Sequence, residues 1–485
     1  MDSVLQDLRH SLRALRRSPG FAVAAILTLA LGLGANTAIF SIVSGVLLRP
    51  LPYEKPDRLI GVWGRHAAIG LEAASLPDFL DWRAGAPSLE RLAGLALTRY
   101  PVSGTDQSEL VPGALITADF FRTLGVTMAA GRDFQDGEDG QASPHVAIIG
   151  YGYWQRRFGG RADAIGHQIS IGRESPYTIV GVAPKGLRVE GDVDLWTPLP
   201  LALDQGRRSD FLHVIGRLRP GATVAGAQQE LATLARRLQE RYPDTNSGWD
   251  VYVVSLQEQL VGEVRPALLV FLGAVGLVLL IACANVANLM LGRLASRQRE
   301  ITVRSALGAS RGRLTQQVLT ESVLLALAGG GLGLLLAVWG VQALRLSSAG
   351  SIPRMDDIAV SLPALGFAFA LSIVTGLTFG LVPAVRLMGH DLHAGLASGG
   401  RSVAGGPGVR GLRGGLVAAE VATAFVLLTG AGLLLRSFVR LLEVDPGFRS
   451  ADVLTATVSL PRVKYSSLPQ RVVLYDQLLE RVRAM

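Results

Sequence analysis

The chain has 485 residues, 49% of them hydrophobic, and a formal net charge of +8. That charge is almost wholly arginine, because Lys55, Lys185 and Lys464 are the only lysines. The apolar residues fall in long runs, which indicates a multipass membrane protein rather than a soluble enzyme. The arginines cluster beside these runs, so membrane orientation explains them and no nucleic-acid partner is expected. The single cysteine, Cys283, excludes an intrachain disulfide.

Residues 1–20 are predicted to form an amphipathic helix on the cytoplasmic leaflet, because leucines alternate with arginines at helical spacing. Their positive charge places the amino terminus in the cytoplasm. Residues 21–48 form the first predicted span, in which Asn36 can hydrogen-bond across helices or to its own backbone. Small residues recur in this span at every fourth position, a pattern that favours close helix packing: Ala30, Gly34 and Ala38.

Residues 49–264 mix short β-like runs with helical patterns and dense turn signals, which predicts one or two small α+β domains. This region lies outside the cytoplasm if the first span points outward. The predicted strands are residues 58–63, 146–149, 168–171, 177–182 and 251–256. The predicted helices are residues 76–83, 118–124, 153–158 and 224–242.

Four further spans are predicted, at residues 266–291, 322–344, 364–387 and 414–435. Residues 345–363 lack an arginine excess, as expected of a short external loop. Residues 388–413 are rich in glycine and serine and read as a cytoplasmic linker. Residues 436–485 are predicted to open a second extracytoplasmic domain, because Leu434-Leu435-Arg436 repeats Leu47-Leu48-Arg49 before a β-like run.

Several polar side chains lie inside the predicted spans. Asn285 and Asn288 are three residues apart, hence on one helix face, and an interhelical hydrogen bond is favoured over a substrate contact. Glu420 is a functional candidate as an intramembrane carboxylate, although it can also reach water or pair with Arg413. GxxxG patterns in two spans are weak signals of close packing: Gly329–Gly333 and Gly376–Gly380.

Motifs for catalysis are absent from the sequence. No lysine lies in a phosphate-binding G-x-x-x-x-G-K-[ST] loop, so the chain is not its own ATPase in the usual way. No HExxH, CxxC or GxSxG motif occurs. His390 and His393 lack a third metal ligand. We therefore expect no catalytic residue, cofactor or metal.

Residues 292–321 form an arginine-rich loop between two spans, which marks the cytoplasmic side. Glu300 precedes Arg304 by four residues, the favourable order for a helical ion pair, and an apolar step then ends at a glycine. One interpretation is a basic hairpin that only sets topology. The other is a short helix offered to a soluble partner, with contact residues Arg299, Glu300, Ile301, Arg304, Ala306, Leu307 and Gly308.

Within this loop, REITVRSALGASRGRLTQQVLTES resembles the cytoplasmic loop of FtsX-like and MacB-type ABC transporter permeases. SPGFAVAAILTLALGLGANTAIFSIVSGVLLRPLPY resembles the opening of the same proteins, and SLPDFLDWR, ITADFFRTLGVTMAAGRDF and YGYWQRRFGG resemble their extracytoplasmic domain. The resemblance implies a multipass α-helical membrane protein with a large α+β extracytoplasmic domain between the first and second spans. It also implies the bacterial cytoplasmic (inner) membrane as location.

The resemblance implies that the loop docks on a separate ABC ATPase subunit. ATP hydrolysis there would move the extracytoplasmic domain for export or mechanotransmission, in a dimeric or pseudo-dimeric permease surrounded by membrane lipid. A subgroup of these permeases carries the unit twice, so a chain ending at Met485 is expected to be one unit plus the opening of a second. The alternative is a membrane sensor or scaffold that binds a cytoplasmic regulator without transport. An intramembrane enzyme is disfavoured, since no catalytic pair lies in the spans.

Overall fold

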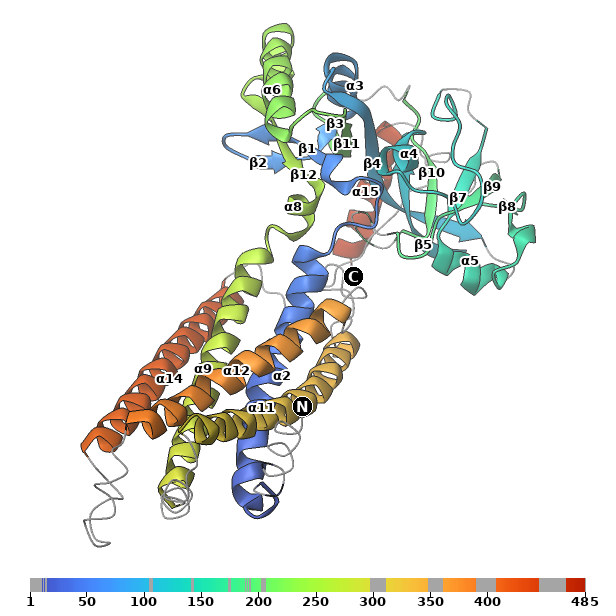
Figure 1. Ribbon diagram of the computed structural model, residues 1–485. Coiled ribbons are helices and arrows are strands. Elements are labelled where there is room, and N and C mark those ends of the chain that lie inside the picture. Colours follow the sequence, from blue (N-terminus) through green and yellow to red (C-terminus); the bar gives the residue numbers. More distant parts are fainter. Residues whose placement is uncertain are drawn as a thin grey trace, which may run out of the picture. The chain divides into compact units, whose positions relative to one another are not determined.

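The computed structural model describes residues 11–484 apart from 12, 14, 104–107, 141–143, 173–175, 188, 190, 192, 202–205, 297–310, 348–360, 390–406 and 445–467. The chain divides into two compact units, residues 1–49 with 261–450 and residues 50–260 with 451–485. The first unit is a helical bundle and the second an α+β domain (Figure 1). Each has its own buried core.

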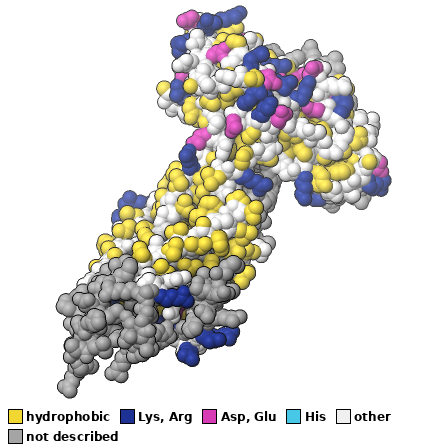
Figure 2. Space-filling model, viewed as in Figure 1, with side chains coloured by type: hydrophobic (Ala, Val, Ile, Leu, Met, Phe, Trp, Pro, Cys, Tyr) yellow, Lys and Arg dark blue, Asp and Glu magenta, His cyan; other side chains and the backbone are white. Residues whose placement is uncertain are grey.

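Among the described residues, five helices are long and apolar enough to cross a membrane, and they coincide with the five predicted spans. They are α2 (Pro19–Val43, continued by the π-helix η1, Ser44–Leu48), α9 (Arg265–Ser296), α11 (Arg311–Ser347), α12 (Leu362–Gly389) and α14 (Pro407–Leu442). Their large apolar side chains are extensively exposed, as in Trp339 at 71% and Phe425 at 70%. Figure 2 shows hydrophobic side chains over much of the described surface of this unit on the face in view, as expected of helices solvated by lipid.

Helices α9 and α11 extend beyond the apolar runs from which the second and third spans were predicted. Residues 292–296 belong to α9 and residues 311–321 to α11, although the sequence placed both stretches in the loop. These flanking residues stay helical because nothing between them and the apolar run breaks the pattern. The seven predicted contact residues, Arg299, Glu300, Ile301, Arg304, Ala306, Leu307 and Gly308, lie outside the described residues.

Other predicted segments also fall wholly or largely outside the described residues. They are residues 1–10 of the amphipathic helix, 348–360 of the external loop, 390–406 of the linker and 445–467 at the opening of the predicted second domain. Beyond the last of these, α15 (Leu468–Arg483) is a helix.

Glycines bring α11 into backbone contact with two neighbouring helices. A Cβ on Gly34 of α2 would lie 2.8 Å from the carbonyl oxygen of Gly333 in α11. A Cβ on Gly376 of α12 would lie 2.9 Å from the Cα of Val323 in α11. Both distances are too short for any side chain, so small residues are required where these helices cross. The small-residue patterns in these three helices therefore mark real crossings.

The α+β domain is built on one twelve-stranded sheet with the order β12-β1-β11-β4-β5-β10-β7-β9-β6. Three short strands lie off this path: β2 pairs with β1, β3 with β11, and β8 with β9. Most neighbours are antiparallel, but β10 runs parallel to β5 and β7 parallel to β9. The strands are β1 Leu59–His66, β2 Gly70–Glu72, β3 Ala74–Ser75, β4 Leu89–Ser103, β5 Ser108–Ile116, β6 Ala130–Gly131, β7 Val146–Ile149, β8 Gln168–Ile169, β9 Tyr177–Val182, β10 Leu195–Pro198, β11 Asp210–Leu218 and β12 Trp249–Ser255.

Helices pack on this sheet and bury its apolar side chains. They are α3 Leu76–Gly85, α4 Phe120–Leu124, α5 Tyr151–Phe158, α6 Val224–Arg241, α7 Pro243–Asn246 and α8 Leu256–Val261, with the 3₁₀ turns η2 Pro56–Arg58 and η3 Ala162–Ala164. Ser75 and Thr223 cap α3 and α6 by accepting backbone N–H groups. Phe79 of α3 and Leu231 of α6 fill one core, and Phe121 of α4 fills another.

The predicted strands and helices of this domain are confirmed to within a few residues. The hairpin of β4 and β5 was not predicted, because the leucine- and alanine-rich LERLAGLAL lacks the alternation of a half-buried strand. These strands lie in the middle of the sheet, where both faces are largely covered, so an alternating pattern is not required.

Candidate functional site

A buried ion pair joins α9 and α11 on either side of residues 297–310. Arg293 of α9 donates from Nη1 to Oε1 of Glu321 in α11. The two side chains are only 10% and 7% exposed. The guanidinium carbon also lies 4.6 Å from the ring centroid of Phe21 in α2, a cation–π distance. Three helices therefore meet at this point, which we call the α9–α11 junction: Phe21, Arg293 and Glu321.

Helix α14 contacts α9 close to the same junction. Nη2 of Arg413 donates to the backbone carbonyl of Asn288 at 3.3 Å. The same Nη2 lies 2.8 Å from where a Cβ on Gly292 would be, so this glycine leaves room for the guanidinium. Arg413 thus attaches α14 to the end of α9 that leads into residues 297–310.

The suggested ion pair between Arg413 and Glu420 is not formed among the described side chains. The two residues are seven positions apart on one helix, an axial rise of about 10.5 Å, and Arg413 instead turns toward α9. Glu420 is half-buried.

Asn36 makes both of the hydrogen bonds considered from the sequence, one to its own helix and one across to another helix. Its Nδ2 donates to the carbonyl of Gly32 on its own helix and to that of Val275 on α9, each at 2.8 Å. Asn288 differs from the expectation, because its Oδ1 is buried and has no hydrogen-bond partner among the described residues. Asn285 is half-buried in α9. Asn36 is therefore the intramembrane amide that links α2 to α9.

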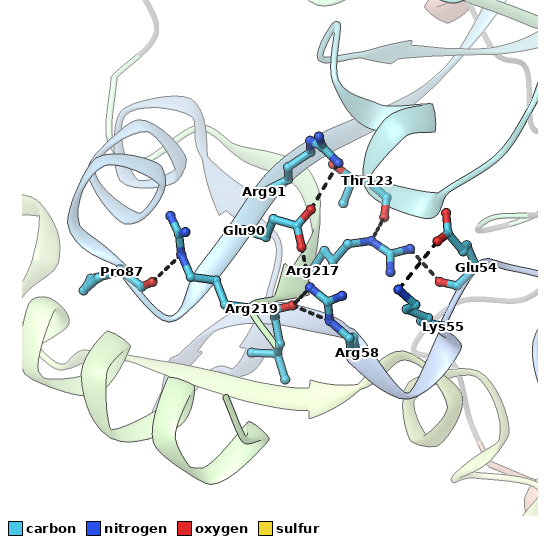
Figure 3. Close-up of polar contacts among 10 residues, drawn as sticks. Glu54, Lys55, Arg58, Pro87, Glu90, Arg91, Thr123, Arg217 and Arg219 are labelled. Atoms are coloured by element: carbon cyan, nitrogen blue, oxygen red, sulfur yellow. Dashed lines mark hydrogen bonds and ion pairs between the residues drawn. The ribbon is translucent and has the colours of Figure 1, made fainter. Parts of the chain in front are cut away.

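In the α+β domain, Arg217 of β11 ties together three parts of the chain (Figure 3). It is 4% exposed, and it donates to the carbonyls of Thr123 and Glu54, each at 2.7 Å. Burial, and then repulsion from the neighbouring Arg58, lower the pKa of its guanidinium. Glu54 lies on the segment that leaves the first span after Leu48. Arg217 therefore anchors that segment to the centre of the sheet.

Further arginines surround this anchor in Figure 3. Arg58 donates to the carboxylate of Glu90 and, from Nε at 2.7 Å, to the carbonyl of Leu218. The hydrogen bond from Arg58 lowers the pKa of Glu90. Arg219 donates to the carbonyl of Pro87 at 2.9 Å. This set was not predicted from the sequence, because its members become neighbours only when β1, β4 and β11 pair.

A second polar cluster lies beyond α4. Nη2 and Nη1 of Arg132 donate to the two carboxylate oxygens of Glu138 at 2.7 and 3.0 Å, a bidentate pair. Arg122 donates to Asp136 at 2.6 Å but stays 3.9 Å from Asp133. Burial raises the pKa of the Asp133 carboxyl to about 6. The residues that the structure describes hold no group of histidine, cysteine, aspartate or glutamate side chains able to bind a metal ion.

Two family models match the chain. The MacB-like periplasmic core domain matches residues 22–234, and the FtsX-like permease C-terminal region matches residues 272–392. The chain belongs to the MacB-type, FtsX-like ABC transporter permeases. The first match covers α2 and most of the α+β domain of this permease. The second runs from α9 to the end of α12 and includes both Arg293 and Glu321.

Curated relatives are longer than this permease. It is 30% identical to the pyoverdine export ATP-binding/permease protein PvdT of Pseudomonas syringae pv. syringae, over 54% of this chain and 39% of that protein. It is 27% identical to the macrolide export ATP-binding/permease protein MacB of Hahella chejuensis, over 77% of this chain and 56% of that protein. The chain thus spans about half the length of such relatives.

A solved structure also aligns with the chain. The periplasmic region of MacB from Actinobacillus actinomycetemcomitans is 10% identical, with a TM-score of 0.34 over 47% of this chain and 97% of that one. The family match and the five apolar helices agree with the predicted fold class, a multipass membrane protein with a large extracytoplasmic α+β domain.

Proposed function

We propose that this permease is the membrane subunit of an ABC-type exporter, in which a separate ATPase subunit moves the extracytoplasmic domain. The ATPase subunit would bind residues 297–310 on the cytoplasmic side. Its own binding and hydrolysis of ATP would then displace these residues. The helices would carry that displacement to the α+β domain.

The observation that carries this proposal is the α9–α11 junction. A loop that only set topology would need no connection between the helices on either side of it. Here Arg293 and Glu321, which precede and follow residues 297–310 in the chain, bind each other in a buried position, and Phe21 adds a third helix. A force on the loop would therefore reach α2, which leads directly into the α+β domain.

The sequence supports a separate source of ATP hydrolysis. None of its three lysines lies in a phosphate-binding loop, whereas PvdT and MacB are ATP-binding/permease proteins by name. The arginine excess in residues 292–321 supports a cytoplasmic position for the loop and the amino terminus, in the inner membrane of a bacterium. A dimeric or pseudo-dimeric assembly would offer two such loops to two ATPase subunits.

Substitutions in residues 297–310 test the proposal. Arg304→Glu and Leu307→Asp should abolish permease-dependent ATP hydrolysis by the P-loop ATPase that co-purifies with the wild-type chain, while membrane insertion stays intact. Arg237→Glu is the matched control, since it makes the same charge change at an exposed position on α6. If no ATPase co-purifies with the wild-type chain, or if both variants couple normally, the assignment is wrong and a sensor or scaffold role is favoured.

Site-specific labelling tests the orientation. In a Cys283→Ser background, a cysteine at Arg304 should react only from the cytoplasmic side and one at Trp154 only from the opposite side. Labelling of both positions from one side would contradict the proposed topology.

A further inference from the structure

Strand β12 lies at one end of the sheet, so no described strand pairs with its outer side. Its sequence, WDVYVVS, carries one charge and a run of four residues that favour strands, Val251–Val254. A strand of this composition at the end of a sheet presents backbone N–H and C=O groups with which a strand of another molecule can pair. Strand β12 is therefore a place where a second chain could add to this sheet.

Hydrogen bonds show which backbone groups of β12 face outward. Antiparallel pairing with β1 uses the backbone of every second residue, and the residues between turn their N–H and C=O groups away. The N–H of Val253 donates to Oε1 of Gln228 in α6 at 2.8 Å, and the C=O of Val251 accepts from Nε2 of the same side chain at 2.7 Å. The N–H of Val251 donates to Oδ1 of Asp250 at 2.8 Å. Val251 and Val253 therefore face away from β1.

A second glutamine of α6 binds the beginning of β12. Nε2 of Gln239 donates to the C=O of Trp249 at 2.7 Å. Gln228 and Gln239 are eleven positions apart, about three helical turns, and so lie on one face of α6. Ala232 and Ala235 lie between them on this face, and their small side chains let the helix approach the strand. We call the outward backbone groups of Trp249, Val251 and Val253 the β12 edge.

Glutamine suits these two positions because its amide carries both a donor and an acceptor, as a peptide group does. Gln228 uses both at once, on groups that belong to two residues of β12. A strand from another molecule would have to displace these amides before it could pair along β12. The β12 edge is therefore covered by side chains of the chain's own helix.

A second copy of this chain would match an uncovered β12 edge by symmetry. If two β12 strands pair in antiparallel orientation about Tyr252, Val251 of each copy lies opposite Val253 of the other. Both residues face outward, so they can exchange hydrogen bonds across the pair. Two copies within one assembly are at a high effective concentration, which would favour this pairing.

We propose that Gln228 and Gln239 cover the β12 edge and thereby prevent the α+β domains of two copies from joining into one continuous sheet. Two domains joined in this way could not move relative to each other. The covering follows from the contacts of α6 with β12 alone. Only its use in a moving dimeric permease rests on the proposed function.

Disulfide cross-linking of the full-length chain in detergent tests this proposal. Tyr252→Cys is introduced in a Cys283→Ser background, because two Cβ atoms at position 252 would lie about 5 Å apart in the symmetric pair. At equal chain concentration, adding Gln228→Ala/Gln239→Ala should raise the cross-linked fraction about fivefold, since the β12 edge is then open to a second strand. An unchanged fraction would refute the proposal.

Two further variants separate edge pairing from a general loss of structure. Gln229→Ala/Glu240→Ala removes exposed side chains one position further along α6 and should leave cross-linking unchanged. Val254→Asp, added to Gln228→Ala/Gln239→Ala, would set a carboxylate opposite Asp250 of the other copy. Repulsion between these like charges should return cross-linking to within about twofold of the chain with both glutamines. Equal cross-linking in the first variant, or persistent cross-linking in the second, would contradict edge pairing.

Hydrogen exchange provides a readout that needs no introduced cysteine. In Gln228→Ala/Gln239→Ala at low chain concentration, the amide of Val253 should exchange about tenfold faster than in the wild type, because its acceptor is gone. Protection should return as the chain concentration rises and the edges pair. Exchange that stays fast at every concentration would refute pairing between copies.

The outcomes distinguish this proposal from the proposed function. If an ATPase co-purifies but opening the β12 edge causes no cross-linking, the covering role is refuted while the proposed function stands. If no ATPase co-purifies with the wild-type chain, the proposed function fails, and cross-linking and hydrogen exchange still decide the role of Gln228 and Gln239.

Discussion

Replacing Asp133 by asparagine should stabilise the α+β domain at neutral pH. The Asp133 side chain is 21% exposed, but its Oδ2 is buried and has no hydrogen-bond partner, because Nε of Arg122 stays 3.9 Å away. Burial therefore raises its pKa from 3.8 to about 6. Asparagine keeps an oxygen to accept the backbone N–H of Phe134, which Asp133 Oδ1 accepts at 2.7 Å, and carries no charge.

The direction and size of this stabilisation follow from the linkage between proton binding and folding. The folded domain binds this proton more tightly than the unfolded chain, so the stability that Asp133 contributes is complete below about pH 3.8 and is lost as the pH rises through about 6. A tenfold change in proton affinity corresponds to about 1.36 kcal/mol, so the full loss is about 3 kcal/mol. Asp133→Asn should therefore match wild type near pH 4 and exceed it by about 2–3 kcal/mol at pH 7.5.

Urea unfolding of the full chain, followed by tryptophan fluorescence, measures this difference. Five of the six tryptophans lie in the α+β domain, and Trp339 alone lies in the bundle. Asp136→Asn is the control: Arg122 lowers the pKa of this exposed carboxylate, so its loss should not stabilise the domain at pH 7.5. An Asp133→Asn variant with the wild-type unfolding midpoint at both pH values would refute the reasoning.

Three further substitutions test the packing. Gly333→Val should destabilise the bundle by at least about 1–3 kcal/mol in SDS titration, because its Cβ would lie 2.8 Å from the Ala30 carbonyl, whereas Gly331→Val, where nothing lies within 4 Å, should be tolerated. Asn36→Leu should cost about 1 kcal/mol in the same titration through loss of its bond to α9, and a neutral result would contradict that role. Arg217→Met should lower the stability of the α+β domain by about 2–3 kcal/mol in urea, since two buried carbonyls lose a charged donor, and an unchanged midpoint would show that burying the charge offsets both bonds.

Helix crossings show where sequence patterns were sufficient and where they were not. The spacing of Gly34 with its neighbours and of Gly329 with Gly333 indicated that two helices could approach closely. Only the structure pairs the two patterns with each other, placing Gly34 against Gly333. A small-residue stripe is a local property of one helix, and its partner depends on how all the helices pack.

The candidate site was predicted in the same partial way. The arginine excess located the loop between the second and third spans, but Arg293 and Glu321 were read only as loop charges. Opposite charges at the facing ends of consecutive antiparallel spans were the available signal. Burial was not readable, because both residues fall beyond the apolar runs and are enclosed only when α2, α9 and α11 come together.

The sequence by itself predicted the five spans, the α+β character of the domain, and five strands and four helices among those that the structure describes in it. These properties depend on the length of apolar runs, on periodicity and on turn residues, all of which act over a few neighbouring positions. Tertiary structure decided which groups replace the hydration of a buried charge: the carboxylate of Glu321 for Arg293, 28 residues away, and the backbone carbonyl of Glu54 for Arg217, 163 residues away. A charge leaves water only where a distant partner replaces its hydration, and the chain creates that environment only by folding.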